Sequence, residues 1–203
     1  MTKSGLGSGP VSCPLPHQGG CARRQFLKIG LAATGVAALA PTAAAATTRP
    51  VAGDALVFQD GPRANTEIRS QDIAVGAPPI LAWPMAPGSA LVRSDDRTNQ
   101  VLLLRFAPDR LAPQAAPWAA GGIVAFSAIC THAACAVTDW DAGQERLRCP
   151  CHGSEFDPRA GGAVLFGPAS RTLPALPLQQ EADALRVAGG FTDWIGGDST
   201  KAD

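Results

Sequence analysis

The chain has 203 residues and no formal net charge, with 17 basic and 17 acidic residues. After removal of any leader, this length leaves room for one domain of ordinary size, which can bury a core unaided. The 22 Gly and 18 Pro, beside seven Phe, four Trp and no Tyr, favour turns and short strands over long helices and predict a loop-rich β protein.

The charges are unevenly distributed along the chain. All four charged residues before residue 47 are basic, and the remainder carries 13 basic and 17 acidic residues, a net charge of −4. Nucleic-acid binding needs a basic surface, and this mildly acidic body has no Lys/Arg cluster. The composition therefore argues against a nucleic-acid partner.

Residues 1–46 have the layout of an export signal. The stretch RRQFLK (23–28) resembles the twin-arginine pattern, which directs already folded proteins to export. The apolar run 29–40 has 12 residues, whereas a membrane-spanning helix needs about 20. We expect cleavage near residues 43–46, with retention as a membrane anchor as the alternative, and a periplasmic location. An Ala-rich disordered tail is a third interpretation, but it leaves the paired arginines unexplained.

The rest of the chain is punctuated by Pro and Gly. Residues 47–66 predict a linker or a loosely attached first strand, residues 67–197 the main domain, and 198–203 a C-terminal tail. Within the domain, strands are predicted in PPILAWP (78–84), SALVRS (89–94), QVLLLRF (100–106), GGIVAFSAIC (121–130), ERLRC (145–149), GGAVLFG (161–167) and, as two strands with a turn at 181–183, ALPLQQEADALRVAGG (175–190). The charged stretch 93–100 is expected to be a solvated hairpin tip. Together these elements predict an all-β antiparallel sandwich or small barrel.

Four of the six cysteines and two of the three histidines lie in CTHAACAVTDWDAGQERLRCPCHGS (130–154). The spacing pairs Cys130 with His132 and Cys149 with His152, one thiol and one imidazole in each of two loops. This matches the Rieske [2Fe-2S] arrangement, in which two thiolates hold one iron and two imidazoles hold the other.

CTHAAC and CPCHGS resemble the two cluster-binding loops of Rieske proteins, in the subclass with a disulfide between the loops. The resemblance implies a Rieske-type antiparallel sandwich or barrel with a small cluster-binding subdomain at one end, its loops within residues 128–170. By this resemblance the iron ligands are Cys130, His132, Cys149 and His152, and the disulfide joins Cys135 to Cys151.

The chemistry of this donor set explains its use. Neutral imidazoles in place of two thiolates make the site less negative, which raises the reduction potential to roughly −150 to +300 mV. A disulfide that closes a loop of about 15 residues stabilises a site with little core by about 3 kcal/mol. Such a bond persists in an oxidising compartment, in agreement with the export signal.

Two other interpretations of the cysteines are weaker. Zinc modules usually pair Cys-x-x-Cys or Cys-x-x-His in both halves, and Cys130-x-His132 is too tight for that spacing. Two disulfides with incidental histidines leave the doubled Cys/His spacing to chance.

Several neighbouring residues are candidates for tuning the cluster. In the family, the serine at the position of Ser154 donates a hydrogen bond to a bridging sulfide and raises the potential. Many high-potential members have Tyr where this chain has Phe156, so one donor is missing and a somewhat lower potential is expected. FGPAS, with Gly167 and Pro168, resembles the proline-containing third loop that covers the cluster; a plain turn is the alternative.

The chain departs from the usual Cys-Thr-His-Leu/Met-Gly-Cys pattern at Ala133 and Ala134. In respiratory relatives the bulky residue after the histidine packs where the domain docks, so Ala133 leaves a thin contact for a cytochrome b partner. If the family's glycine adopts positive φ, Ala134 introduces backbone strain. The stretches from residue 121 through 178 and 189–197 resemble the small Rieske subunit of arsenite oxidase, whereas Gly153-Ser154 is typical of cytochrome bc and b6f subunits.

These features predict a one-electron carrier with no catalytic residue and no substrate site of its own. Its expected partners are a larger redox subunit, molybdenum-containing or of cytochrome b type, and a downstream acceptor such as a c-type cytochrome. The most favoured parent is an arsenite-oxidase-like complex; a quinol-oxidising cytochrome bc-type complex and a stand-alone ferredoxin-like carrier or assembly protein are alternatives. A ring-hydroxylating oxygenase needs a second iron with two further histidines, and only His17 remains.

Overall fold

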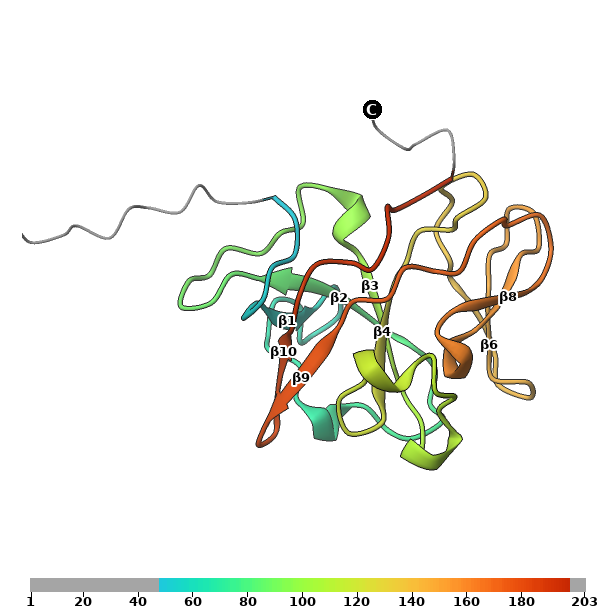
Figure 1. The fold of residues 1–203 in the computed structure, drawn as a ribbon. Helices are drawn as coiled ribbons and strands as arrows, with labels where there is room; N and C mark the ends of the chain where they lie inside the picture. Colours follow the sequence, from blue (N-terminus) through green and yellow to red (C-terminus); the bar gives the residue numbers. More distant parts are fainter. Residues whose placement is uncertain (1–47, 198–203) are drawn as a thin grey trace, which may run out of the picture. The chain divides into compact units, whose positions relative to one another are not determined.

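The computed structural model describes residues 48–197; the predicted export signal and C-terminal tail lie outside this range. Within it are ten strands and five short 3₁₀ helices (Figure 1). None of the helices in residues 48–197 is long and apolar enough to cross a membrane. Every strand pair in the two sheets is antiparallel.

The larger sheet has six strands in the order β4-β3-β2-β1-β10-β9. Its members are β1 (Ala55–Phe58), β2 (Ile80–Met85), β3 (Val101–Arg105), β4 (Ile123–Ser127), β9 (Leu178–Glu181) and β10 (Ala184–Val187). β1 pairs with both β2 and β10, and therefore joins the first strands of the domain to the last. β9 and β10 form a hairpin with Ala182 and Asp183 at its turn.

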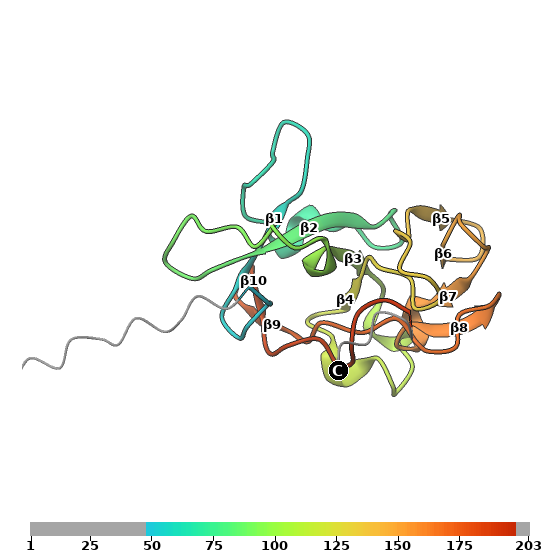
Figure 2. The ribbon, with the colours of Figure 1, turned by 90° about the horizontal axis from the view of Figure 1, so that it is seen from above.

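The smaller sheet has four strands in the order β5-β6-β7-β8 and is inserted between β4 and β9. Its strands are β5 (Asp139–Asp141), β6 (Arg146–Arg148), β7 (Glu155–Asp157) and β8 (Ala163–Phe166). Figures 1 and 2 show this sheet beside one end of the larger sheet. The Cys/His segments lie where the chain enters this sheet after β4 and where it passes from β6 to β7.

Short 3₁₀ helices fill the connections between strands. They are η1 (Ser70–Asp72), η2 (Arg97–Asn99), η3 (Pro108–Arg110), η4 (Ala116–Trp118) and η5 (Pro158–Ala160). Pro occupies an early position in η3, η4 and η5, where its missing N–H costs no helical hydrogen bond.

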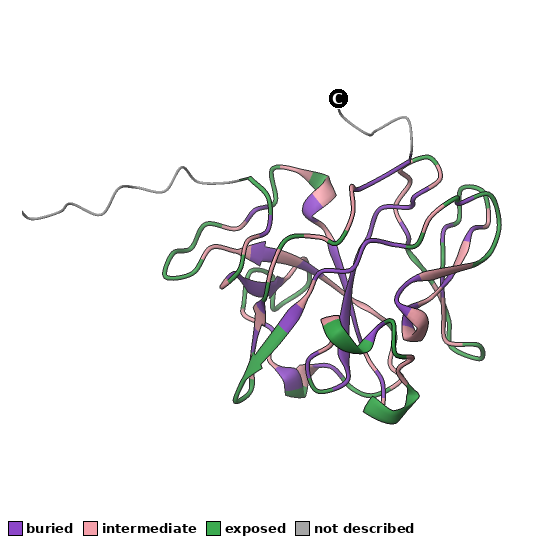
Figure 3. Ribbon diagram, in the orientation of Figure 1, coloured by how far each residue is buried: buried purple, intermediate pink, exposed green. Residues whose placement is uncertain are grey.

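Two apolar clusters form the core, and strand alternation separates them. In β3, Leu103 faces one cluster, with β1 and β10, while Leu102 and Leu104 face the other. This second cluster extends from Phe126 of the larger sheet to Phe156 of the smaller sheet and includes the side chains of Cys130 and Cys149. The Cys/His segments thus share one core with the scaffold, and buried residues run along β3 and β4 in Figure 3.

The all-β antiparallel prediction is confirmed, with differences in detail. β1 lies in the middle of the six-stranded sheet, with Leu56 and Val57 fully buried, so it is not loosely attached. The predicted strand at 89–94 is reduced to a single bridge between Met85 and Val92. β5 and β7 were not predicted because DWD and EFD are three-residue strands dominated by acidic side chains, which give no apolar signal.

The prediction of a solvated tip at residues 93–100 holds for the middle of the stretch, where Ser94, Asp95 and Arg97 are exposed, but is wrong for its two ends. The Arg93 side chain is 6% exposed and pairs with Asp54, which is fully buried, through bonds of 2.7 Å (Nε) and 3.0 Å (Nη2). The Asn99 amide, also buried, donates to the Arg93 carbonyl at 3.1 Å. Arg93 folds inward because a buried acid on the segment before β1 pairs with it, and the neutral Asn99 folds inward to bond to the Arg93 backbone.

Replacement of Asp54 by Asn is expected to destabilise the domain strongly. The buried Arg93 charge then loses its carboxylate partner, and breaking a buried ion pair costs about 3–5 kcal/mol. Urea unfolding measures the change in the free energy of unfolding. The control is Asp183→Asn, because Asp183 pairs with Arg69 at 3.1 Å where the side chains are 53% and 41% exposed, and exposed pairs contribute about 0–1 kcal/mol. Equal losses in the two variants would contradict the buried-pair interpretation.

Candidate functional site

Two six-residue loops with the same backbone pattern form the site. In loop 1 (residues 130–135), the Cys130 N–H donates to the Cys135 carbonyl at 2.8 Å and the Ala134 N–H donates to the Cys130 carbonyl at 3.1 Å. In loop 2 (residues 149–154), the corresponding bonds join Cys149 to Ser154 at 2.8 Å and Gly153 to Cys149 at 3.0 Å. Each loop therefore begins with a cysteine whose N–H and carbonyl both close the loop.

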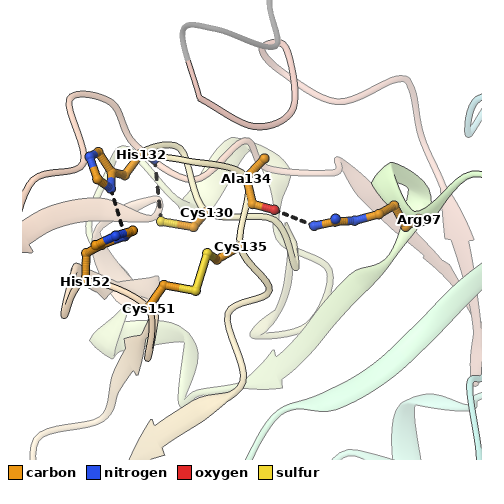
Figure 4. The surroundings of a disulfide bond; sticks show 7 residues. All are labelled: Arg97, Cys130, His132, Ala134, Cys135, Cys151 and His152. Atoms are coloured by element: carbon orange, nitrogen blue, oxygen red, sulfur yellow. Dashed lines mark hydrogen bonds between the residues drawn. A yellow bond between two sulfur atoms is a disulfide. The ribbon is translucent and has the colours of Figure 1, made fainter.

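The fifth position of each loop has a left-handed backbone. Gly153 has φ +73° in loop 2, and Ala134 has φ +55° in loop 1. Such a conformation costs roughly 1–2 kcal/mol for a residue with a Cβ. The strain expected at Ala134 is confirmed. The Ala134 carbonyl accepts a hydrogen bond from the guanidinium of Arg97 in η2, which ties loop 1 to the larger sheet's connections (Figure 4).

The first cysteine of each loop is buried and carries a free thiol. Cys130 and Cys149 are each 1% exposed, and they are the free cysteines among the described residues. Burial raises the pKa of the Cys130 thiol, and the neighbouring Cys149 acts in the same direction, whereas the His132 N–H at 3.5 Å from the sulfur opposes the rise. Iron binding needs both thiols as thiolates, and metal charge would replace the proton that this environment favours.

The two imidazoles face each other at the surface. The Nδ1 atoms of His132 and His152 are 3.3 Å apart, and the rings meet edge to face, with centroids 4.8 Å apart and planes at 88°. His152 is exposed and His132 is partly exposed. Figure 4 shows the two rings next to each other, with the Cys130 sulfur beside them.

A disulfide joins the two loops, as the family resemblance implied. Cys135 ends loop 1 and bonds to Cys151 of loop 2, with the Cα atoms 6.5 Å apart. The sulfurs of Cys135, Cys149 and Cys151 lie within 4.8 Å of one another. Two of these three sulfurs are bonded to each other, so only Cys149 of this group offers a thiolate. The disulfide therefore clamps the loops beside the donor set.

Ser154 and Phe156 lie on the buried side of loop 2. Both are fully buried. The Ser154 hydroxyl oxygen accepts from the Ala169 N–H at 3.2 Å. The same side chain hydrogen-bonds with Cys130, which opposes the rise that burial causes in the pKa of that thiol. A hydroxyl has one proton to donate, so accepting from Ala169 leaves that proton for sulfur. Phe156 packs in the core cluster that contains both free cysteines and offers no donor there.

The FGPAS segment packs on loop 2. Gly167 has φ +90°, and a Cβ on it would lie 2.5 Å from the Ser154 Cα and 2.9 Å from the Gly153 carbonyl oxygen. Only glycine permits this approach. Pro168 and the side chains of Leu165 and Phe166, which are 43% and 68% exposed, lie at the surface beside the contact. The segment is therefore in contact with loop 2.

Two buried thiols and two facing imidazoles, in paired loops at the end of an antiparallel β scaffold, fit an iron-sulfur cluster with mixed sulfur and nitrogen ligands. The class defined by this fold and donor set is an electron-transfer domain with a [2Fe-2S] cluster. The chain matches the family of the Rieske [2Fe-2S] domain over residues 98–177.

Two relatives, a bc1-complex subunit and a nitrate reductase subunit, support the same assignment. The chain is 32% identical over 139 residues to the cytochrome bc1 complex Rieske iron-sulfur subunit of Streptomyces lividans, covering 65% of this chain and 79% of that protein. It is 31% identical over 180 residues to a putative respiratory nitrate reductase subunit Rieske of Haloferax mediterranei, covering 83% and 77%. The soluble domain of Rieske protein II from Sulfolobus acidocaldarius matches at TM-score 0.36 and 24% identity, over 47% of this chain and 66% of that one. The chain belongs to the Rieske iron-sulfur family, and its cofactor is a [2Fe-2S] cluster.

Several residues that shape the site were not predicted. Arg97, Thr131, Arg171 and Gly197 contact loop 1 or the segments on it. Thr131 lies within the motif, but the others are 35 to 65 residues from His132 in the printed sequence. No sequence pattern predicts these contacts, because neither periodicity nor spacing reports which distant segment packs on a loop.

Replacement of Ala134 by Gly is expected to stabilise the domain by about 1 kcal/mol, because it removes the energetic cost of a left-handed backbone at a residue with a Cβ. The greater flexibility of glycine in the unfolded chain offsets only part of this gain. Denaturant unfolding measures the difference. The matched control is Gly153→Ala, because a Cβ there meets nothing within 4 Å and only the positive φ opposes it. We expect the control to be destabilised by a similar amount; stabilisation of both variants, or of neither, would refute the symmetry of the loops.

Proposed function

We propose that Cys130 and Cys149 ligate one iron of the cluster and that His132 and His152 ligate the other through their facing Nδ1 atoms. The protein is a Rieske electron-transfer subunit, and the observation that supports this ligand assignment is the split in burial within the donor set. Two thiols 1% exposed lie beneath two imidazoles at the surface. When bound, the cluster supplies one-electron chemistry.

The chain's own residues give that chemistry a direction. Buried Cys130 and Cys149 keep water from the sulfur side, while His132 and His152 reach the surface, so a partner approaches from the imidazole side. Ala133, directly after His132, is exposed, and the exposed Leu165 and Phe166 precede Gly167, which packs on loop 2. An electron entering or leaving through the histidine edges crosses less protein than one passing through the core.

The proposed parent is an exported oxidoreductase complex of the arsenite oxidase type, in which this chain is the small Rieske subunit and a molybdenum-containing subunit holds the substrate site. Exposed Ala133 supports this choice, because its single methyl gives little apolar contact for a cytochrome b partner. The relative with the broadest cover of this chain among those given above, at 83%, is named for a nitrate reductase complex and not for a bc1 complex.

A second candidate is the Rieske subunit of a quinol-oxidising cytochrome bc-type complex, with a c-type cytochrome downstream. The name of the Streptomyces lividans relative supports it, as does Gly153-Ser154 in loop 2. The two candidate complexes differ in the larger subunit, which contains molybdenum in the first and is of cytochrome b type in the second.

Export by the twin-arginine route and a periplasmic location complete the proposal. The Cys135–Cys151 disulfide supports them, since disulfides persist in oxidising compartments. The pattern RRQFLK at residues 23–28 supplies the route.

Two substitutions are expected to move the reduction potential in opposite directions. Ser154→Ala removes a donor near the cluster sulfurs and lowers the potential, because the reduced site is more negative and needs the donor more. Phe156→Tyr adds a hydroxyl in the core cluster shared with Cys130 and Cys149 and raises it. Shifts of tens of millivolts are expected, at about 59 mV for each tenfold change in the equilibrium constant. Protein-film voltammetry measures both; no change in either variant contradicts the assigned tuning roles.

Native purification distinguishes the two parents. The complex is purified through this subunit, and iron, molybdenum and haem are quantified, with the intact mass of the subunit showing whether the leader is cut. We expect two irons per subunit, molybdenum in the larger partner and a mass lacking residues 1–46. Haem b without molybdenum would establish the bc-type alternative, and iron alone with no partner would overturn both.

A further inference from the structure

Residues 191–197, here called the 191–197 segment, reach loop 1 at Gly197. A Cβ on Gly197 would lie 2.1 Å from the His132 carbonyl oxygen and 2.8 Å from its carbonyl carbon. Real side chains do not approach backbone this closely, so Gly197 is required by contact and not by an unusual φ. Gly197 covers loop 1 in the way that Gly167 covers loop 2.

Arg171 holds this segment in place. Its Nη1 donates to the Asp193 carboxylate at 3.1 Å and to the Trp194 carbonyl at 3.4 Å, and its Nη2 donates to the Gly196 carbonyl at 2.6 Å. The guanidinium also stacks on the Trp194 ring, 3.6 Å from the centroid, a favourable cation–π contact. The Arg171 side chain is 14% exposed. A planar guanidinium satisfies several acceptors at fixed angles, which a lysine cannot reproduce.

The backbone of Arg171 also binds loop 1 directly. Thr131, 1% exposed, lies between Cys130 and His132, and its hydroxyl donates to the Arg171 carbonyl at 2.7 Å. Arg171 thus binds loop 1 at Thr131, the residue before His132. It also anchors the 191–197 segment, in which Gly197 contacts the His132 carbonyl. Arg171 therefore fixes the backbone of His132 in two ways, through Thr131 and through the segment that contains Gly197.

We propose that Arg171 and Gly197 are positioning residues for His132, which fix the ring direction and so the electronic structure and retention of the cluster. The proposal rests on the proposed role of His132 as an iron ligand. A ring that is free to tilt changes its bond to iron, whereas a general loss of packing lowers stability without that change. The reduced cluster's electron paramagnetic resonance (EPR) g-values report the difference.

The first experiment compares Gly197→Ala with Gly190→Ala in the full-length protein. At Gly190 a Cβ meets nothing within 4 Å, and it lies one residue before the segment. We expect Gly197→Ala to shift the g-values and the reduction potential and Gly190→Ala to keep both at wild-type values. Unshifted g-values and potential in a Gly197→Ala protein that retains its iron would overturn the proposal.

The second experiment compares Arg171→Met with Arg171→Lys and Arg186→Met. Arg186 is also a partly buried arginine. It lies in β10 of the larger sheet, away from the loops, and bonds to Glu67. We expect Arg171→Met to lose its cluster several-fold faster at fixed temperature and to shift the g-values, Arg171→Lys to recover part of both, and Arg186→Met to show neither effect.

The outcomes separate this inference from the function on which it rests. Wild-type protein whose cluster gives g-values of sulfur ligands alone sinks the proposed ligand assignment. A wild-type mixed-ligand signal that Arg171→Met and Gly197→Ala both leave unmoved sinks only the positioning role. If Arg171→Met does not accumulate, the comparison of Gly197→Ala with Gly190→Ala decides.

Discussion

Four donors of opposite character must meet within two six-residue loops, and the rest of the structure serves that constraint. The thiols of Cys130 and Cys149 are buried away from water, while the rings of His132 and His152 reach the surface. A strand would put Cys130 and His132, two residues apart, on the same face of a sheet. A tight loop that starts at a buried cysteine and turns outward within two or three residues supplies both environments.

The loops gain their rigidity from elsewhere. Neither has a strand of its own, so each is closed by two backbone hydrogen bonds and joined to the other by the Cys135–Cys151 disulfide. Phe156 and Leu147 extend the scaffold core beneath them. Glycine contacts then seal the outer sides, with Gly167 on loop 2 and Gly197 on loop 1. The scaffold acts as a fixed base from which unlike ligands can be presented to one cofactor.

Charged residues contribute by reaching across the fold. Arg97 bonds to loop 1 from η2, and Arg171 bonds to the 191–197 segment. Both donate to backbone carbonyls and so fix the path of the chain, and Arg171 also pairs with the Asp193 carboxylate. The buried Asp54–Arg93 pair plays the same part in the scaffold, where it fixes the connection after β2 against the segment before β1.

The sequence by itself determined the chemistry of the site. Cys130, His132, Cys149 and His152 carry their donor types and their local spacing, and both are properties of adjacent residues. It also determined most strands, since runs such as VLLLR in β3 are apolar over strand length. The left-handed strain at Ala134 followed from a family pattern and was found at φ +55°.

Only the tertiary structure decided what holds the site. β1 is central because it meets β10, more than 120 residues later, and a turn-rich segment gives no sign of such a partner. Arg93 is buried because Asp54 is there to pair with it, whereas a charged stretch alone predicts exposure. Gly197 must be glycine because the His132 carbonyl lies against it. Composition and periodicity describe a residue's neighbours along the chain, while burial and contact depend on which distant segments the fold brings together.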